Sequence, residues 1–133
     1  MRPITAKELR KDAEALSKVT TSEARRRSTV SRAYYAAYHR CLAWVSRLPN
    51  RPRPPSSGSV HAWLIQCLKT PDPMCDPKLA ARSEALGELM YEQRDRRVHA
   101  DYRLKEPVDQ TMVDAQIEDV RKTFQTCADT STS

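Results

Sequence analysis

The segment VSRAYYAAYHRCLAWVSRL, residues 30–48, decides the fold of this chain. Its apolar residues recur at intervals of three and four, which is the period of one face of an α-helix. Additional apolar residues widen this face, so the segment predicts a helix that is buried on more than one side, as in the centre of a bundle or at a dimer interface. The face consists of Val30, Tyr34, Ala37, Cys41, Val45 and Leu48, and it is widened by Tyr35, Tyr38 and Leu42.

Proline positions divide the rest of the chain into helical segments. All nine prolines lie at Pro3, between Pro49 and Pro55, between Pro71 and Pro77, and at Pro107. Proline disrupts helix interiors, so the stretches between these clusters are free to be helical. The chain has only two glycines and few β-branched runs, which argues against a sheet. The sequence therefore predicts an all-α fold.

Capping signals mark where the helices begin. Thr5 with Glu8 and Thr20 with Glu23 have the spacing of capping boxes, and Asp76 before Pro77 is a cap followed by a first-turn proline. Residues 49–59 predict a basic loop, and the last helix follows Pro107 and Asp109. We expect four main helices and one short helix, in one domain over residues 1–128 with a polar tail over 129–133. The apolar faces of the short third helix and of the final helix consist of Val60, Trp63, Leu64, Cys67 and Leu68 in the former and Val113, Ile117, Val120, Phe124 and Cys127 in the latter.

Charge and cysteine content limit the classes of partner. The 133 residues carry a formal net charge of +6, which favours an anionic partner such as nucleic acid. The four cysteines lack the spacing of metal ligands, so no metal site and no cofactor are predicted, and reduced thiols favour a cytoplasmic protein. No apolar run approaches the roughly 20 residues that cross a bilayer, so no membrane association is expected.

The stretch RDRRVH, residues 94–99, is the candidate functional motif. An arginine can hold a phosphate and a histidine can transfer a proton. At about 100° per residue, Arg94 and His99 lie roughly 140° apart on a regular helix, so they do not share a face. An unwound helix end or a second copy across a two-fold axis would bring them together. Asp95 and His99 do share a face, as do Arg94 and Arg97, and Tyr91 and Tyr102 extend the first of these faces.

A structural interpretation of the same residues stays open. Charged runs at helix ends are often solvated faces with local ion pairs. His39 and His61 lie beside apolar faces, where histidines are commonly core or boundary residues. The tyrosines of residues 34–38 fit core and interface packing better than a platform for stacking bases.

Two segments resemble the HEPN family of small α-helical domains. They are SRAYYAAYH, residues 31–39, and RDRRVHADY, residues 94–102, which is similar to the family's R-x-x-x-x-H motif and to its R-x-x-A-D-Y variant. The resemblance covers most of the chain in helix order and implies a HEPN-like helical bundle. Many members are metal-independent ribonucleases that act as toxins or phage-defence effectors.

The resemblance also implies roles for particular residues. Arg94 would hold the scissile phosphate, His99 would transfer protons and Asp95 would orient them. The reaction would be attack by the RNA 2′-hydroxyl on phosphorus, which leaves a 2′,3′-cyclic phosphate and a 5′-hydroxyl. Further candidates are Arg97, Arg96 and Arg32 as RNA or phosphate ligands and Tyr102, Tyr91 and Tyr35 in supporting positions.

The family's partners set the expectations for assembly. Its ribonucleases work as homodimers in which two motifs face one cleft, and many are neutralised by an antitoxin or a nucleotidyltransferase. One alternative is a non-catalytic HEPN module that binds a nucleotide or a partner nucleotidyltransferase. A helical interaction domain without a nucleotide role is the other alternative.

Overall fold

The computed structural model describes residues 3–19, 22–50 and 52–128, and these fold into five α-helices without a strand. The all-α prediction is confirmed for the described residues. The predicted tail, 129–133, lies outside them. The helices are α1 (Ala6–Ser17), α2 (Glu23–Val45), α3 (Val60–Lys69), α4 (Pro77–Tyr102) and α5 (Gln110–Ala128).

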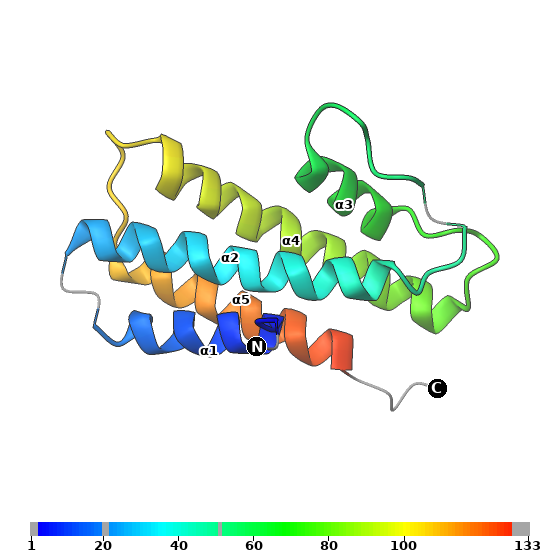
Figure 1. Ribbon diagram of the computed structural model, residues 1–133, viewed down its shortest axis with the longest axis horizontal. Helices are drawn as coiled ribbons and strands as arrows, with labels where there is room; N and C mark the ends of the chain where they lie inside the picture. The colour runs from blue at the N-terminus through cyan, green and yellow to red at the C-terminus, as the bar shows by residue number, and fades with distance from the viewer. Residues whose placement is uncertain (1–2, 20–21, 51, 129–133) are drawn as a thin grey trace.

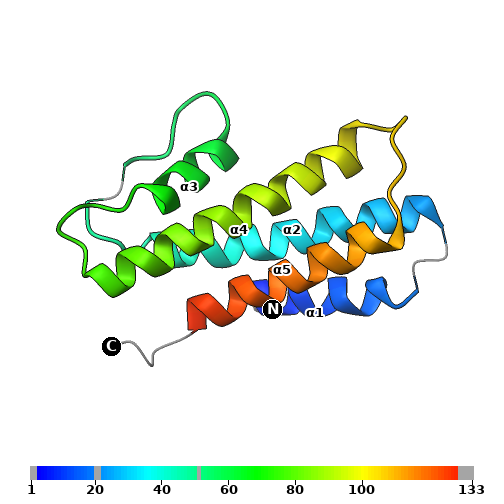
Figure 2. The ribbon, with the colours of Figure 1, turned by 180° about the vertical axis from the view of Figure 1, so that it is seen from behind.

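Helix α2 occupies the centre of the arrangement, as its wide apolar face predicts. It packs against all four other helices, and α5 also packs against α1 and α4. Figures 1 and 2 show α1 and α5 on one side of α2, with the short α3 on the other side beside α4. The C-terminal end of α4 extends past α3, so the Arg94 to His99 segment starts beside the N-terminal end of α3 and continues toward the end of the bundle that α3 does not cover.

Side-chain caps fix the starts of the helices. The hydroxyl of Thr5 accepts a hydrogen bond from the backbone N–H of Glu8, and the Asp76 carboxylate accepts from the N–H groups of Lys78 and Leu79. Both predicted starts are confirmed. The predicted cap Thr20 lies outside the described residues, and Ser22 is the residue that caps α2 by accepting from Arg25 N–H.

The C-terminal end of α2 differs from the prediction. The helix ends at Val45 rather than continuing to Leu48. Backbone N–H groups of Arg47 and Leu48 bond to carbonyls three residues earlier, which tightens the chain into a turn before Pro49. Leu48 is nevertheless buried, so the apolar pattern identified its burial and not its secondary structure.

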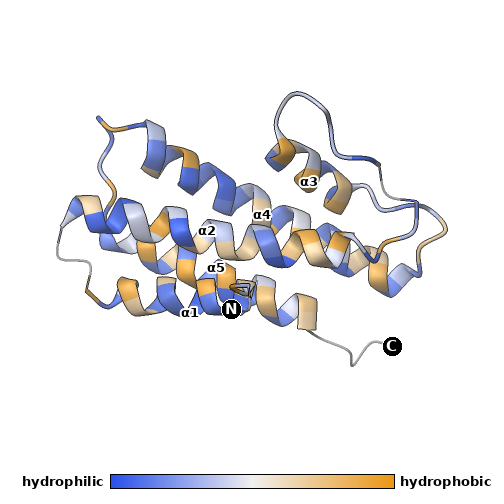
Figure 3. Ribbon diagram, in the orientation of Figure 1, coloured by the Kyte–Doolittle hydropathy of each residue, from blue (hydrophilic) through white to orange (hydrophobic). Residues whose placement is uncertain are grey.

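The core contains one apolar side of every helix. Figure 3 shows the hydrophobic residues concentrated along the surfaces where the helices face one another. All four cysteines are free and buried, so each packs as a small apolar side chain. Within the described residues, no helix has both the length and the hydropathy needed to cross a membrane. The largest fully buried side chains include Tyr34, Leu64, Leu68, Leu86 and Met90.

A layer of buried amides joins α2, α4 and α5. The side-chain amide of Gln116 donates to the backbone carbonyls of Val30 and Gln93, at 3.2 and 3.1 Å. The amide of Gln93 donates to the hydroxyl of Thr123 at 2.8 Å. Unpaired buried amides are costly, so these bonds favour one register between the three helices.

Helix α3 packs closely on α4 at Gly87. A Cβ atom at this position would lie 2.6 Å from Cγ of Lys69 and 3.2 Å from its backbone nitrogen. The buried hydroxyl of Ser83 donates to the carbonyl of Leu68 at 2.6 Å, which satisfies one of the free carbonyls at the end of α3. This contact places the N-terminal end of α3 over α2 and beside Arg94.

Candidate functional site

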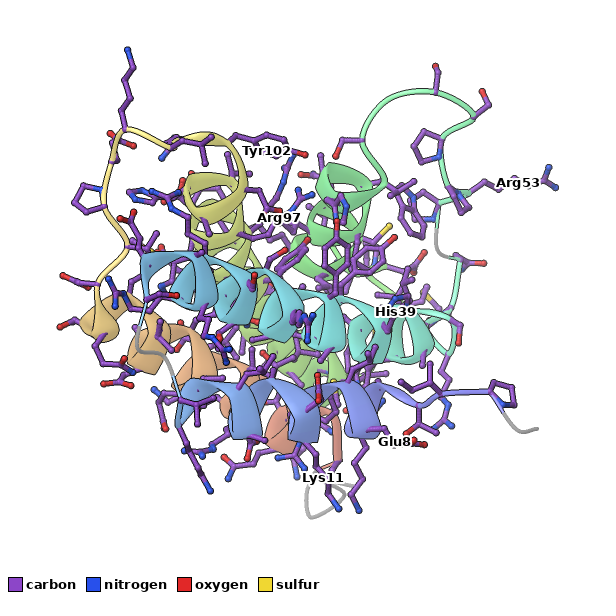
Figure 4. The ribbon with its side chains drawn as sticks, turned by 60° about the vertical axis from the view of Figure 1, so that its left-hand side comes forward. Glu8, Lys11, His39, Arg53, Arg97 and Tyr102 are labelled. Carbon is purple, nitrogen blue, oxygen red and sulfur yellow. The ribbon has the colours of Figure 1, made fainter. Side chains whose placement is uncertain are left out.

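The Arg97 side chain lies where the C-terminal half of α4 crosses α2. Its Nη2 donates to the hydroxyl of Tyr35 at 2.9 Å and to that of Tyr102 at 3.4 Å. The guanidinium carbon lies 5.3 and 5.4 Å from the centroids of these two rings. Figure 4 shows Arg97 and Tyr102 on the opposite side of α2 from α1. The two aromatic rings therefore hold the cation in one orientation.

An acidic residue of the same helix holds Arg97 from another side. Asp101 Oδ2 lies 2.9 Å from Arg97 Nε, one helical turn away, and it accepts a hydrogen bond from the Ser31 hydroxyl of α2 at 3.2 Å. The Arg97 side chain has 12% relative exposure. Its geometry is thus set before any ligand binds, and a bidentate anion would have to share the cation with Asp101.

Arg94 points from α4 toward the start of α3. Its Nη2 lies 3.4 Å from the hydroxyl of Ser59, the N-cap of α3. Tyr91, Asp95, Val98 and Arg103 line a pocket of about 210 Å³ together with Arg94. Arg94 is therefore accessible from solvent while still being close to α3.

His61 of α3 completes the basic cluster. Burial lowers the pKa of His61, and the positive charges of Arg97 and Arg94 lower it further. Its ring centroid lies 5.9 Å from that of Tyr35, the residue that contacts Arg97. The structure therefore places an imidazole beside Tyr35 and within reach of the charges of both arginines, and this imidazole comes from a different helix than the predicted one.

A buried tyrosine orients His61. The hydroxyl of Tyr34, which is fully buried, lies 2.8 Å from Nδ1 of His61. Burial raises the pKa of Tyr34, so its hydroxyl stays protonated and can donate to or accept from the ring. The Tyr38 ring packs against the other side of the cluster, with its centroid 4.6 Å from that of His61. Nδ1 is thus occupied by Tyr34, and proton exchange with a ligand would use Nε2.

His99 faces the loop between α4 and α5. Its Nε2 lies 3.1 Å from the carbonyl oxygen of Pro107, and its Nδ1 lies 3.7 Å from Oε2 of Glu106. The carboxylate beside His99 is therefore Glu106, whereas Asp95 lies 3.8 Å from Nη1 of Arg103. Because a carbonyl only accepts, His99 carries its proton on Nε2 in this arrangement.

The C-terminal end of α4 is a regular helix. It continues without interruption to Tyr102, and the backbone N–H of Arg103 still bonds to the carbonyl of His99. Arg94 and His99 consequently remain on different faces. Of the two routes that could bring them together, unwinding of the helix end does not occur in this structure.

Arg27 of α2 binds backbone carbonyls at the end of α4. Its guanidinium donates to the carbonyls of His99 and Ala100 at 3.2 and 2.9 Å, and also to the Glu106 carbonyl. A cation at this position complements the negative end of the helix dipole. The same guanidinium pairs with Glu23 at 2.7 Å and holds the pKa of that carboxyl below its usual value. Arg27 thereby fixes the backbone that carries His99.

Two predicted phosphate ligands point away from this cluster. Arg96 pairs with Asp119 of α5 at 2.7 Å and also contacts Gln116, so it stabilises the contact between α4 and α5. Arg32 lies 3.4 Å from Asp12 of α1. Tyr91 is 54% exposed, and its ring lies under the Lys69 ammonium at 4.5 Å.

The cluster therefore combines predicted and unpredicted residues. Arg97, Tyr35 and Tyr102 contact one another as predicted site residues, whereas Arg94 of the same helix points toward Ser59. The motif did not identify Tyr34, His61, Ser31, Asp101 and Arg27, although Asp101 lies one turn after Arg97 and Tyr34 belongs to the tyrosine run. The pairing of His61 with Tyr34 spans 27 positions, and no local pattern in the sequence indicates it.

The arrangement can hold an anion and exchange protons with it. Two guanidinium groups are suited to a phosphodiester, and the neighbouring imidazole titrates at a pKa below its usual value. The Tyr102 ring is exposed and offers a surface on which a base can stack. No protein-family model, no curated protein and no solved structure matches this chain.

Proposed function

We propose that this chain is a metal-independent endoribonuclease of HEPN type, acting as a toxin or phage-defence effector. The observation that carries the proposal is the convergence of Arg94, Arg97 and His61 beside Tyr35 and Tyr102. These residues come from three helices, so they gather only in the folded protein. The resemblance of residues 31–39 and 94–102 to HEPN segments supports the same activity.

The two arginines hold the scissile phosphate in this proposal. Arg97 supplies a fixed cation because Asp101 and Tyr35 restrain it, and Arg94 supplies a more accessible one. Positive charge stabilises the phosphorane, which carries more negative charge than the diester. Unstacked bases of single-stranded RNA pack against the exposed ring of Tyr102.

The chemistry consists of two proton transfers at one phosphorus. A base removes the proton from the 2′-hydroxyl, whose oxygen forms a bond to phosphorus, and the bond from phosphorus to the 5′-oxygen breaks. An acid donates a proton to that leaving oxygen, so the products are a 2′,3′-cyclic phosphate and a 5′-hydroxyl. We assign His99 to one of these roles, as its motif implies, and His61 is available for the other through Nε2. Asp95 belongs to the same motif but lies beside Arg103, so it would have to turn toward His99 to orient it. His99 must leave the Pro107 carbonyl before it can act.

A homodimer supplies the geometry that one copy lacks. Arg94 and His99 of one regular helix lie on different faces, so we propose that a second copy places its motif across the same cleft. Exposed apolar side chains next to the motif support this interface, since Tyr102 and Leu104 are 67% and 71% exposed. Sedimentation of the wild type should give a dimer, and Leu104→Ser should shift it toward monomer.

Activity in excess chelator tests the proposal. The wild type should cleave single-stranded RNA, whereas Arg94→Ala and His99→Ala should each lose at least about a hundredfold in rate. His39→Ala is the matched control, because His39 is an exposed histidine on α2 that makes no contact with the motif (Figure 4). Cleavage by the wild type that survives both motif changes would contradict the mechanism. Expression of the wild type, and not of His99→Ala, should arrest growth.

A non-catalytic module is the second candidate, and one contact favours it. The carbonyl of Pro107 occupies His99 Nε2, so Arg94 and Arg97 could bind a phosphate without proton transfer. Such a module would bind a nucleotide or a partner nucleotidyltransferase. Tight binding of RNA or nucleotide by an inactive wild type would favour this candidate over the nuclease.

A further inference from the structure

A second basic pocket lies on the other side of α2, away from Arg97. It has a volume of about 600 Å³ and is formed by the first turns of α1, by α2 and by the last turns of α5. Figures 1 and 2 both show the start of α1 beside the C-terminal part of α5. Pockets that hold small organic ligands have volumes of about 300 to 1,000 Å³. This pocket shares no residue with the candidate RNA site.

The walls of the pocket are basic and its floor is apolar. Of the lining residues in the described part of the chain, four are cationic and none is acidic, whereas Phe124, Ala6 and Ala128 supply apolar surface. The guanidinium of Arg10 lies 5.0 Å from the centroid of the Phe124 ring, so the cationic and aromatic parts adjoin each other. The cationic residues are Lys7, Arg10, Arg40 and Arg121.

The acidic residues nearby do not balance these charges. Glu14 pairs with Arg10 at 3.0 Å and with Arg121 at 3.6 Å, so one carboxylate serves two guanidinium groups. Lys7 and Arg40 make no ion pair or hydrogen bond with any residue in the described part of the chain. Arg40 is half-buried, and a partly desolvated cation that no described residue pairs with favours binding of an anion.

We propose that this pocket binds an organic anion with a hydrophobic body. A carboxylate or phosphate head would pair with Arg40 and Lys7, and the body would lie against Phe124. A simple inorganic anion would leave the apolar floor exposed, and an uncharged apolar ligand would leave Arg40 unpaired. The pocket therefore favours a ligand that combines a negative charge with an apolar body.

Titration calorimetry of the full chain with octanoate tests this inference. Octylamine has the same chain with the opposite charge, and acetate has the same head without the chain. Octanoate should bind, whereas acetate and octylamine should bind at least about tenfold more weakly. Removing the charged hydrogen bond in Arg40→Gln should weaken octanoate binding about tenfold. Lys11→Gln is the matched control, because Lys11 is an exposed cation on α1 outside the pocket and its replacement removes the same charge (Figure 4).

Two results would overturn the proposal. The first is equal binding of octanoate and octylamine, which would indicate apolar adsorption without recognition of charge. The second is an equal loss of affinity in Arg40→Gln and Lys11→Gln, which would indicate the overall charge of the protein rather than the pocket. Lys7→Gln repeats the test at a second cationic residue of the pocket, and because Lys7 is exposed, its replacement should not disturb folding.

Discussion

The buried hydroxyl of Tyr34 lies 2.8 Å from Nδ1 of His61, and this contact joins the central helix to the short helix α3. It orients an imidazole whose ring neighbours Tyr35, the tyrosine that holds Arg97. Helix α3 thereby brings the imidazole of His61 close enough to α4 that the charges of Arg97 and Arg94 act on it.

His61 should titrate at a pKa below that of a free histidine. Burial and the charges of Arg97 and Arg94 all disfavour its protonated form. Between this lowered pKa and the unfolded value near 6.5, the unfolded chain binds more protons than the folded one, so the free energy of unfolding falls as the pH drops through that window.

Nuclear magnetic resonance should show the lowered pKa of His61, and Arg97→Gln should raise that pKa. Denaturation at pH 7.5 and 5 should show a smaller loss of stability in His61→Gln than in the wild type. Titration of His61 at or above 6.5 would contradict this electrostatic account.

Arg97 and Arg96 should behave differently although they are adjacent. Arg97 belongs to the candidate site, whereas Arg96 pairs with Asp119 of α5. Arg97→Gln should weaken RNA binding. It should also reduce the slope of the logarithm of the RNA association constant against the logarithm of salt concentration by about one, because one fewer counterion is released. Arg96→Gln should reduce the free energy of unfolding by about 1 to 3 kcal/mol and leave the salt slope close to that of the wild type. Fluorescence anisotropy at several salt concentrations measures the first effect. An unchanged salt slope in Arg97→Gln would remove Arg97 from the RNA site.

The C-terminal end of α4 should depend on Arg27. Its guanidinium donates to the carbonyls of His99 and Ala100 in the last turn of α4, where carbonyls lack a full set of helical partners. Arg27→Gln should therefore lower the free energy of unfolding by about 2 kcal/mol and increase hydrogen exchange around His99. Arg25→Gln removes an exposed arginine of the same helix and serves as the control. Equal stability of the two variants would show that solvent satisfies these carbonyls equally well.

The close approach of α3 and α4 should not tolerate a larger side chain at Gly87. A Cβ there would lie 3.2 Å from the backbone nitrogen of Lys69, so a valine must displace α3. Gly87→Val should cost about 1 to 3 kcal/mol in urea denaturation. Ala85→Val on the exposed side of α4 measures the helix propensity of valine alone, and it should cost only about half a kcal/mol. If both variants lost the same free energy of unfolding, the close contact with α3 would not explain the loss at Gly87.

Local patterns explain most of the helices and few of the site contacts. Asp76 with Pro77 marks the start of α4 because capping involves only the next few residues, and the spacing of apolar residues predicts that Tyr34 and Cys41 are buried. Leu48 shows the limit of periodicity, since a buried residue can follow the helix in a tight turn. A pattern of burial does not specify the backbone conformation.

The partners of the charged residues depend on tertiary structure. Asp95 shares a helical face with His99, yet it lies beside Arg103, and the loop after α4 brings Glu106 to His99 instead. Helical spacing identifies which residues can meet and does not decide among competing partners. His61 lies more than thirty positions before Arg94, so only the packing of α3 reveals that they are close.

Replacement of a single 2′-hydroxyl in the RNA tests the central claim most directly. A single-stranded RNA should be incubated with the wild type in excess chelator, and its products identified by mass spectrometry. The account predicts 2′,3′-cyclic phosphate and 5′-hydroxyl ends, and it predicts that 2′-deoxy substitution at the cleaved nucleotide abolishes cleavage at that bond. Cleavage that persists at the 2′-deoxy nucleotide, or products with 5′-phosphate ends, would contradict attack by the 2′-hydroxyl.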